Sequence, residues 1–133
     1  MTRLLVALLF LLAAVLPAGA QQYRQATAHI TTQTTTTVHA AVTGKRLAVV
    51  AGSVCVDANG TATGIALQDS AGTNLFGTGI VWVVGAGACL NFPLRGTGAP
   101  VPYGRPTALS TSLQVVTTVG NGPVEVYLEV QAQ

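Results

Sequence analysis

Charged side chains are scarce in this chain of 133 residues, because Asp, Glu, Lys and Arg together make up only 8% of it. An average globular protein has about 25%. Apart from Arg3 near the N-terminus, five basic residues stand against four acidic ones. So small an excess provides no positive surface for nucleic acid. The sequence therefore excludes nucleic acid as a partner and predicts an exterior rich in Thr, Ser, Gln and Gly.

Metal ligands are equally few, with two histidines and two cysteines in the whole chain. His29 and His39 are ten residues apart, which places them about 33 Å apart on one straight strand, too far to share a metal. Two cysteines with no histidine or further cysteine nearby do not make a zinc site. The sequence predicts neither a metal site nor a cofactor.

The four acidic residues do not form an obvious catalytic set. Glu125 and Glu129 share one side of a predicted strand at a separation of about 13 Å, whereas glycoside hydrolysis uses carboxylates about 5–10 Å apart. Asp57 begins a faint calcium-like loop that lacks the other ligands. Asp69 precedes Ser70, but no G-x-S-x-G motif surrounds that serine. Because each of these residue sets is incomplete, the sequence predicts that the protein is not an enzyme.

The long apolar run of the chain lies at its N-terminus, over residues 4–16. It follows Arg3, ends at Pro17 and precedes Ala18-Gly19-Ala20, the pattern of a cleavable signal peptide over residues 1–20. The run is too short to span a bilayer comfortably. We therefore expect a secreted, periplasmic or extracellular protein that has no membrane attachment after cleavage.

Export changes the interpretation of Cys55 and Cys89, because an oxidising compartment favours a disulfide. If Val54 and Val56 face the core, Cys55 faces outward, and the same alternation places Cys89 outward when Leu90 faces inward. The second and fifth strands are neighbours in an immunoglobulin-like order. The sequence thus predicts a Cys55–Cys89 bridge on the outer surface of a sheet.

No segment after the leader has the apolar spacing of a helix, whereas β-branched residues and turn signals recur every 8–12 residues. We expect a Thr-rich arm or edge strand in residues 21–44 and a β-sandwich in residues 45–133. An immunoglobulin-like or jelly-roll-like antiparallel sandwich of about seven strands is favoured, with a closed barrel as the alternative. The predicted strands cover residues 29–39, 46–57, 61–68, 74–84, 88–92, 107–119 and 124–131.

Two local patterns give detail to this prediction. Asn59-Gly60 is typical of a two-residue hairpin turn that joins the strands on either side. In the last strand, apolar residues alternate with polar ones, so one face is core and the other faces solvent. The residues expected in the core at the C-terminal end are Leu109, Leu113, Val115, Val124, Val126, Leu128 and Val130.

A proline-containing loop over residues 94–106 is the best binding candidate in the sequence. It carries Arg95, Tyr103 and Arg105, and its stiffness lowers the entropy lost on binding. A simple connection that crosses between the two sheets is the other interpretation of this loop, and the sequence favours it. Trp82 lies between two valines and is either a core residue or a stacking platform for a sugar.

Several segments resemble a loose group of small β-sandwich proteins from tailed-phage and uncultured viral genomes. The resemblance rests on G-K-R-L-A-V-V, A-T-G-I-A-L-Q-D-S-A-G-T, L-N-F-P-L-R-G-T and a final V-x-V-x-L-x-V strand. It covers about two-thirds of the chain, from Lys45 to Val130. It implies a virion-associated structural or adhesive role.

These observations favour a non-enzymatic structural or adhesion module that acts through surface contacts. A secreted carbohydrate-binding module, using Trp82 or Tyr103 against a cell-surface glycan, is the alternative. Self-association is also expected, because so few charges leave the sheet edges unprotected. We predict that residues 29–39 form the contact.

Overall fold

The computed structural model describes residues 23–77, 82–96, 100–119 and 123–133, and the predicted leader lies outside these ranges. These residues contain no helix, and accordingly none that is long and apolar enough to cross a membrane. The strands in chain order are β1 (Tyr23–Ile30), β2 (Thr35–His39), β3 (Leu47–Val56), β4 (Thr63–Asp69), β5 (Trp82–Val84), β6 (Cys89–Phe92), β7 (Leu113–Val119) and β8 (Val124–Ala132).

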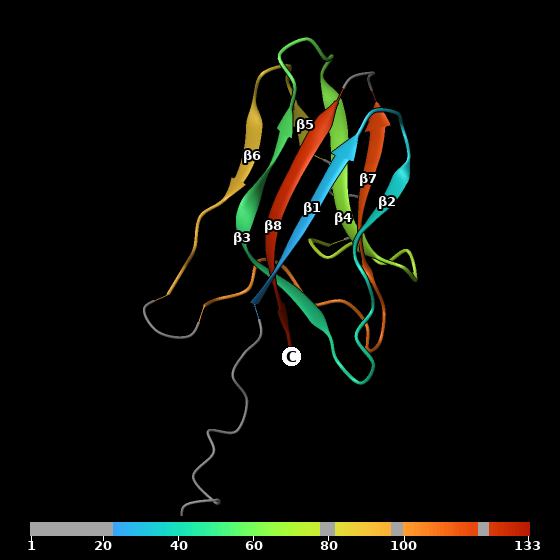
Figure 1. The fold of residues 1–133 in the computed structure, drawn as a ribbon, viewed down its shortest axis with the longest axis vertical. Coiled ribbons are helices and arrows are strands. Elements are labelled where there is room, and N and C mark those ends of the chain that lie inside the picture. Colours follow the sequence, from blue (N-terminus) through green and yellow to red (C-terminus); the bar gives the residue numbers. More distant parts are fainter. Residues whose placement is uncertain (1–22, 78–81, 97–99, 120–122) are drawn as a thin grey trace, which may run out of the picture.

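The strands form two antiparallel sheets of four. The first sheet has the order β1-β8-β3-β6, and the second has the order β2-β7-β4-β5. In Figure 1 the first sheet lies in front of the second, with β6, β3, β8 and β1 side by side. The chain therefore folds as an antiparallel β-sandwich, which confirms the predicted fold class.

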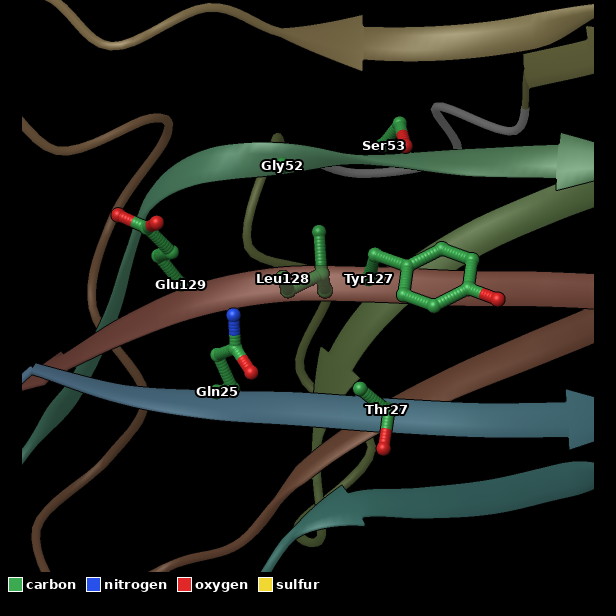
Figure 2. Close-up of a pocket in the computed structure, with 7 residues that line it drawn as sticks. All are labelled: Gln25, Thr27, Gly52, Ser53, Tyr127, Leu128 and Glu129. Carbon is green, nitrogen blue, oxygen red and sulfur yellow. The ribbon is translucent and has the colours of Figure 1, made fainter.

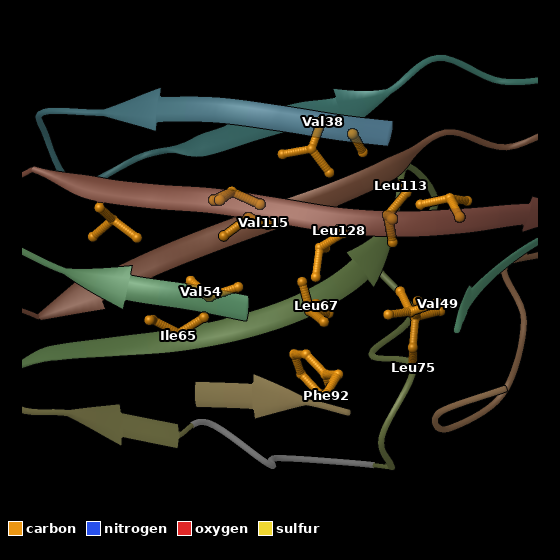
Figure 3. Packing of buried hydrophobic residues seen from close by; sticks show 14 of the residues in the cluster. Val38, Val49, Val54, Ile65, Leu67, Leu75, Phe92, Leu113, Val115 and Leu128 are labelled. Carbon is orange, nitrogen blue, oxygen red and sulfur yellow. The ribbon is translucent and has the colours of Figure 1, made fainter. Parts of the chain in front are cut away.

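The core is the layer of aliphatic side chains between the two sheets (Figure 3). β8 supplies Val124, Val126, Leu128 and Val130, all buried, while Glu125, Tyr127 and Glu129 between them point outward. This confirms the alternation predicted for the last strand. Facing residues come from the second sheet, among them Ile65, Leu67, Leu113 and Val115. Each fully buried side chain of this kind contributes about 1.5–3 kcal/mol relative to exposure.

The predicted hairpin at Asn59-Gly60 is wrong. β3 and β4 do not pair, because the segment between them crosses from the first sheet to the second. Neither Asn59 nor Gly60 has the positive φ that the predicted turn requires. Instead the carboxylate of Asp57 accepts from the N–H of Asn59 at 2.7 Å, and the Gly60 N–H donates to the Asp57 carbonyl at 2.9 Å. The turn redirects the chain without pairing its flanking strands.

The prediction of one continuous strand over residues 29–39 is also wrong. β1 ends at Ile30 in the first sheet, and β2 begins at Thr35 in the second. The turn between them is held by Thr117, whose hydroxyl accepts from the N–H of Thr34 at 3.0 Å and lies 3.2 Å from the carbonyl oxygen of Thr32. The Thr-rich segment therefore crosses between the two sheets.

Two further strands are shorter than predicted. Of residues 74–84, only β5 is regular strand, the Asn74 side chain caps a turn at Phe76, and residues 78–81 lie outside the described residues. Of residues 107–119, only the part from Leu113 onward is strand. Ser110 has φ +57° within the turn before it. The expected core residue Leu109 is therefore 56% exposed.

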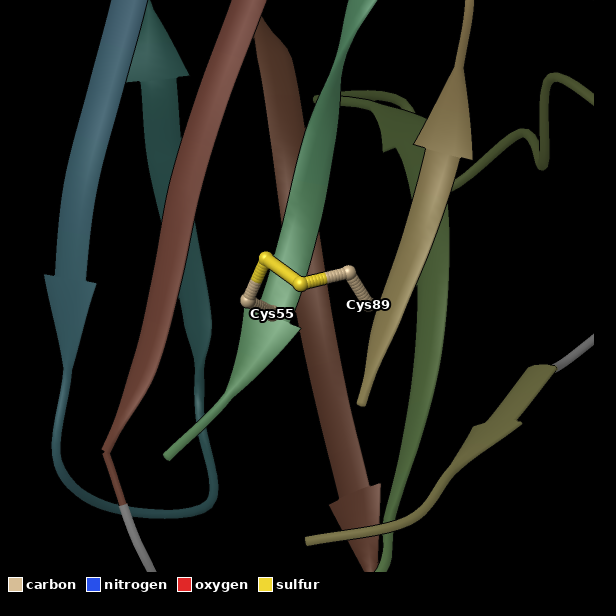
Figure 4. Close-up of a disulfide and its surroundings, with 2 residues drawn as sticks. All are labelled: Cys55 and Cys89. Carbon is tan, nitrogen blue, oxygen red and sulfur yellow. A yellow bond between two sulfur atoms is a disulfide. The ribbon is translucent and has the colours of Figure 1, made fainter. Parts of the chain in front are cut away.

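Cys55 and Cys89 form a disulfide that joins β3 to β6 (Figure 4). The two residues are directly opposite each other in the register of these neighbouring strands. Cys89 is exposed and Cys55 is partly exposed, on the outer surface of the first sheet. The predicted bridge between the second and fifth predicted strands is thus confirmed.

Replacing both cysteines with serine is expected to lower the free energy of unfolding by about 2–4 kcal/mol, since the bridge closes a loop of 34 positions. The fold should survive, because the bridge lies outside the core. Urea denaturation of the variant and of the wild type measures the difference. Loss of the cooperative transition in the variant would contradict a peripheral role for the bridge.

Candidate functional site

Trp82 and Tyr103 belong to a cluster of four aromatic rings between β5 and β6, the edge strands on one side of the sandwich. The ring centroids of Phe76 and Trp82 are 4.7 Å apart, those of Trp82 and Phe92 are 6.1 Å apart, and those of Phe92 and Tyr103 are 5.2 Å apart. All three pairs meet edge to face, a favourable geometry for aromatic packing. The cluster joins the two sheets where no backbone pairing does so.

Arg95 lies against the same cluster, with its guanidinium carbon 3.8 Å from the centre of the Tyr103 ring. Its Nη2 also donates to the carbonyl of Pro102 at 3.1 Å, and the Tyr103 hydroxyl donates to the carbonyl of Pro93. This cation–π contact and both hydrogen bonds join residues 93–95 to residues 102–103. They hold these two segments together around the ring of Tyr103.

Arg105 lies elsewhere, because its Nε and Nη2 both donate to the carbonyl of Asn74, at 3.0 and 2.7 Å. Backbone hydrogen bonds from Tyr103 to Val49 and from Thr107 to Leu47 fasten the end of the loop beside β3. The structure thus brings together three of the four predicted binding residues and separates Arg105 from them. Their role in binding a partner stays a prediction.

A different surface, the outer face of the first sheet, carries the most exposed ring that is surrounded by polar groups. Tyr127 of β8 is 54% exposed and is flanked in register by Thr27 of β1 and Ser53 of β3. Two residues further along these strands, on the same face, Gln25 of β1 is opposite Glu129 of β8. We call this surface the Tyr127 face, and its outward-facing members are Gln25, Thr27, His29, Ser53, Glu125, Tyr127 and Glu129.

A shallow hollow of about 160 Å³ lies on this face. Its lining residues come from three neighbouring strands: Gln25, Thr27, Gly52, Ser53, Tyr127, Leu128 and Glu129 (Figure 2). β3 has a bulge between Val49 and Ala51, where its register with β8 shifts. Gly52 follows this bulge, and a Cβ atom there would collide with the carbonyl oxygen of Tyr127. Gly52 and its partner in the register, Leu128, both line the hollow.

A second, more open hollow of about 370 Å³ adjoins the first. Thr27 and Tyr127 line both hollows, so they form the boundary between the two. The far end of the second hollow carries His29 and Glu125, whose side chains contact each other, the imidazole Nδ1 donating to the carboxylate. Together the hollows extend along β8 on both sides of the tyrosine ring.

Sequence reasoning missed the Tyr127 face as a site. The alternation in β8 does place Glu125, Tyr127 and Glu129 on one exposed face, which was the available signal. The contribution of Gln25 and Ser53 depends on the register of β1 and β3 against β8, which local patterns do not reveal. This face offers hydroxyl, amide and carboxylate groups around one aromatic ring, a set suited to hydrogen bonding and stacking.

Within the described ranges, no three side chains of the His, Cys, Asp and Glu types come together to hold an ion.

No protein-family model matches the chain, and no curated protein or solved structure matches it either.

Proposed function

We propose that this protein is an exported, non-enzymatic structural or adhesion module that works through its surface and self-associates through β1. One observation carries the proposal: β1 is by far the longest of the edge strands. Within the described residues the edges are β1 with eight residues, β2 with five, β5 with three and β6 with four. Very short edge strands resist pairing with other chains, whereas long regular ones favour it.

The sequence of β1 does little to prevent such pairing. It contains no proline and no lysine, and Arg24 is its single arginine. Its register against β8 continues without a bulge from Tyr23 to Ile30. In an antiparallel ladder, alternate residues direct their N–H and C=O groups away from the neighbouring strand. These groups suit the addition of an antiparallel β1 strand from a second copy, which would join two first sheets about a two-fold axis.

The Cys55–Cys89 disulfide supports the exported location in this proposal, because such a bridge suits an oxidising compartment. The exported protein could be secreted, periplasmic or part of a virion surface, and these three locations are distinguished by where it is recovered. Recovery of the protein from purified virus particles would support the last location, and its recovery only from the cell-free medium or the periplasm would support the others.

The self-association is tested by placing a lysine on each candidate edge. Ala28 lies half-buried in β1, so in Ala28→Lys a charge points inward at the edge, a device that blocks strand pairing. Thr35→Lys is the control in β2, the other edge strand within residues 29–39; Thr35 is exposed, so this lysine protects the edge from the solvent side. Light scattering over 1–500 µM protein should show a dimer or larger assembly for the wild type and for Thr35→Lys. The dissociation constant of the assembly should be at least tenfold higher for Ala28→Lys than for the wild type.

Three results of this experiment would contradict the proposal. They are a wild-type monomer at 500 µM, equal assembly of both variants, and selective loss of assembly in Thr35→Lys. Far-ultraviolet circular dichroism shows whether each variant retains its strands. If Ala28→Lys does not fold, Ala28→Asp and Ala28→Glu place a charge on a shorter side chain at the same edge.

Carbohydrate binding is the second candidate function, and the Tyr127 face favours it. Trp82 and Tyr103 are partly buried among other rings, so they offer less open ring surface than Tyr127 does. Adhesion through a glycan and assembly through β1 are compatible, because one uses the outer face of the first sheet and the other uses its edge.

A further inference from the structure

We infer that the Tyr127 face binds an uncharged oligosaccharide chain that lies along β8, with one sugar ring stacked on Tyr127. The inference rests on the proposed adhesive function and names its site and its ligand class. The site lies on the face of the first sheet, away from the loop residues Arg95, Tyr103 and Arg105.

The first argument is the position of the Tyr127 ring. Figure 2 looks onto the outer face of the first sheet and shows this ring broadside, lying along β8. A ring in this orientation presents its π face to solvent, and that face is a suitable platform for the apolar C–H face of a pyranose. The phenol hydroxyl at the far end of the ring stays available for a hydrogen bond.

The polar groups beside the ring match sugar hydroxyls. Gln25 and Glu129 are cross-strand partners, so their side chains rise from neighbouring strands about 5 Å apart. The amide of Gln25 both donates and accepts, and the carboxylate of Glu129 accepts only. Adjacent hydroxyls of a sugar need such a mixture, and the hydrogen bond to an ionised acceptor is the stronger kind. Ser53 adds a hydroxyl from the opposite side of β8.

The extent of the two hollows indicates more than one sugar unit. Tyr127 and Thr27 separate the smaller hollow from the larger, so a ring stacked on Tyr127 would have open space before and after it. Glu129 marks one end and Glu125 the other, about 13 Å apart along the strand. A short linear chain fits this length better than a single monosaccharide does.

The charges on the face select against acidic sugars. The ionisable groups that line the hollows are Glu125, Glu129, His29 and the phenol of Tyr127, and the imidazole of His29 donates to Glu125. Two carboxylates would repel the carboxylate of a sialic or uronic acid. Neutral hexose and N-acetylhexosamine chains meet no such repulsion.

The test measures binding of the purified protein to oligosaccharides of known charge. Cellotetraose, maltotetraose, mannotetraose and tetra-N-acetylchitotetraose are the neutral probes, and sialyllactose and tetragalacturonate are the anionic ones. Tyr127→Ala should weaken binding of the best neutral probe at least tenfold, whereas Tyr127→Phe should stay within about threefold because it keeps the ring face. Tyr23→Ala is the matched control, since Tyr23 is 45% exposed but lines neither hollow.

Each remaining outcome overturns the inference in an identifiable way. Binding that survives in Tyr127→Ala but is lost in Trp82→Ala or Tyr103→Ala would move the glycan site to the aromatic cluster. Binding to the anionic probes alone would contradict the charge argument. No binding to any probe would remove the glycan inference, while assembly of the same sample in light scattering would leave the proposed structural function standing.

Discussion

Replacing Asp69 with alanine is expected to lower the free energy of unfolding by about 3–5 kcal/mol. Asp69 is only 1% exposed, at the end of β4. Its Oδ1 accepts from the N–H groups of Ala71 and Thr73 at 3.0 and 2.9 Å, and its Oδ2 accepts from the N–H of Ala108 at 3.1 Å. The substitution leaves three backbone donors without this acceptor, and each such donor, when buried, costs about 1–3 kcal/mol.

The matched control is Asp57→Ala. The Asp57 carboxylate accepts from the N–H of Asn59 in a similar turn, but that hydrogen bond is exposed to solvent. Water can replace an exposed acceptor, so this variant should lose no more than about 1 kcal/mol. Urea denaturation of both variants measures the two losses. Equal losses would contradict a special role for the buried carboxylate, and Asp69→Asn, which keeps one oxygen, extends the test if Asp69→Ala does not fold.

Acid should reduce the contribution of Asp69 to the free energy of unfolding. Burial alone would raise the pKa of this carboxyl, but the N–H groups of Thr73, Ala108 and Ala71, together with the Thr73 side chain, outweigh burial and lower the pKa. A lowered folded-state pKa stabilises the protein fully above about pH 4, where the carboxyl is ionised in the unfolded chain too. This stabilisation is lost as the pH falls through the folded-state pKa. The difference between wild type and Asp69→Ala should therefore shrink below pH 4.

Replacing Gly52 with alanine should have a similarly large effect, about 3–5 kcal/mol. Gly52 has φ +126°, a conformation that residues with a side chain rarely adopt. A Cβ atom there would collide with the carbonyl oxygen of Tyr127 and come within 2.7 Å of the Cα of Leu128. Both contacts are with the backbone of β8, so the strands themselves would have to separate.

Gly72→Ala separates the two causes of this effect. Gly72 also has a positive φ, +81°, but a Cβ atom there meets no atom within 4 Å. Its replacement should lose only the conformational term, about 1–2 kcal/mol. Thermal and urea denaturation of both variants give the comparison. Equal and small losses would mean that β3 and β8 are not as close at Gly52 as the structure has them.

Local sequence patterns predicted the elements whose two faces differ in polarity. The alternation of valine and leucine with Glu125, Tyr127 and Glu129 identified β8, because a strand with one buried face must alternate. The same reasoning placed Cys55 and Cys89 outward on neighbouring strands. Both predictions needed only the alternation of side chains and, for the cysteines, an assumed strand order.

The division of strands between the sheets was not available from such patterns. Asn59-Gly60 indicates a turn but not whether the next strand pairs back or crosses to the other sheet. In this chain the Asp57 carboxylate caps the turn, Asn59 and Gly60 have an ordinary backbone conformation, and the following segment crosses to the second sheet. Thr117 similarly holds the turn that ends β1, from more than 80 positions away. Long-range contacts of this kind leave no local signal.

The same limit applies to the candidate sites. The residue types of Trp82, Tyr103 and Arg95 predict a binding role. These residues meet because β5 and β6 lie at the same side of the sandwich. The Tyr127 face depends on the register of three strands and on the bulge beside Gly52. Residue types alone do not reveal which strands come together to line a hollow.

Backbone hydrogen exchange in β1 tests most directly whether this module assembles through its open edge. Exchange is measured for each amide at 5 µM and at 500 µM protein. We predict that amides of β1 directed away from β8 exchange freely at the lower concentration and become protected at the higher one, while amides of β2 and β6 do not change. Unchanged exchange in β1 at a concentration where light scattering detects assembly would contradict the proposed edge contact.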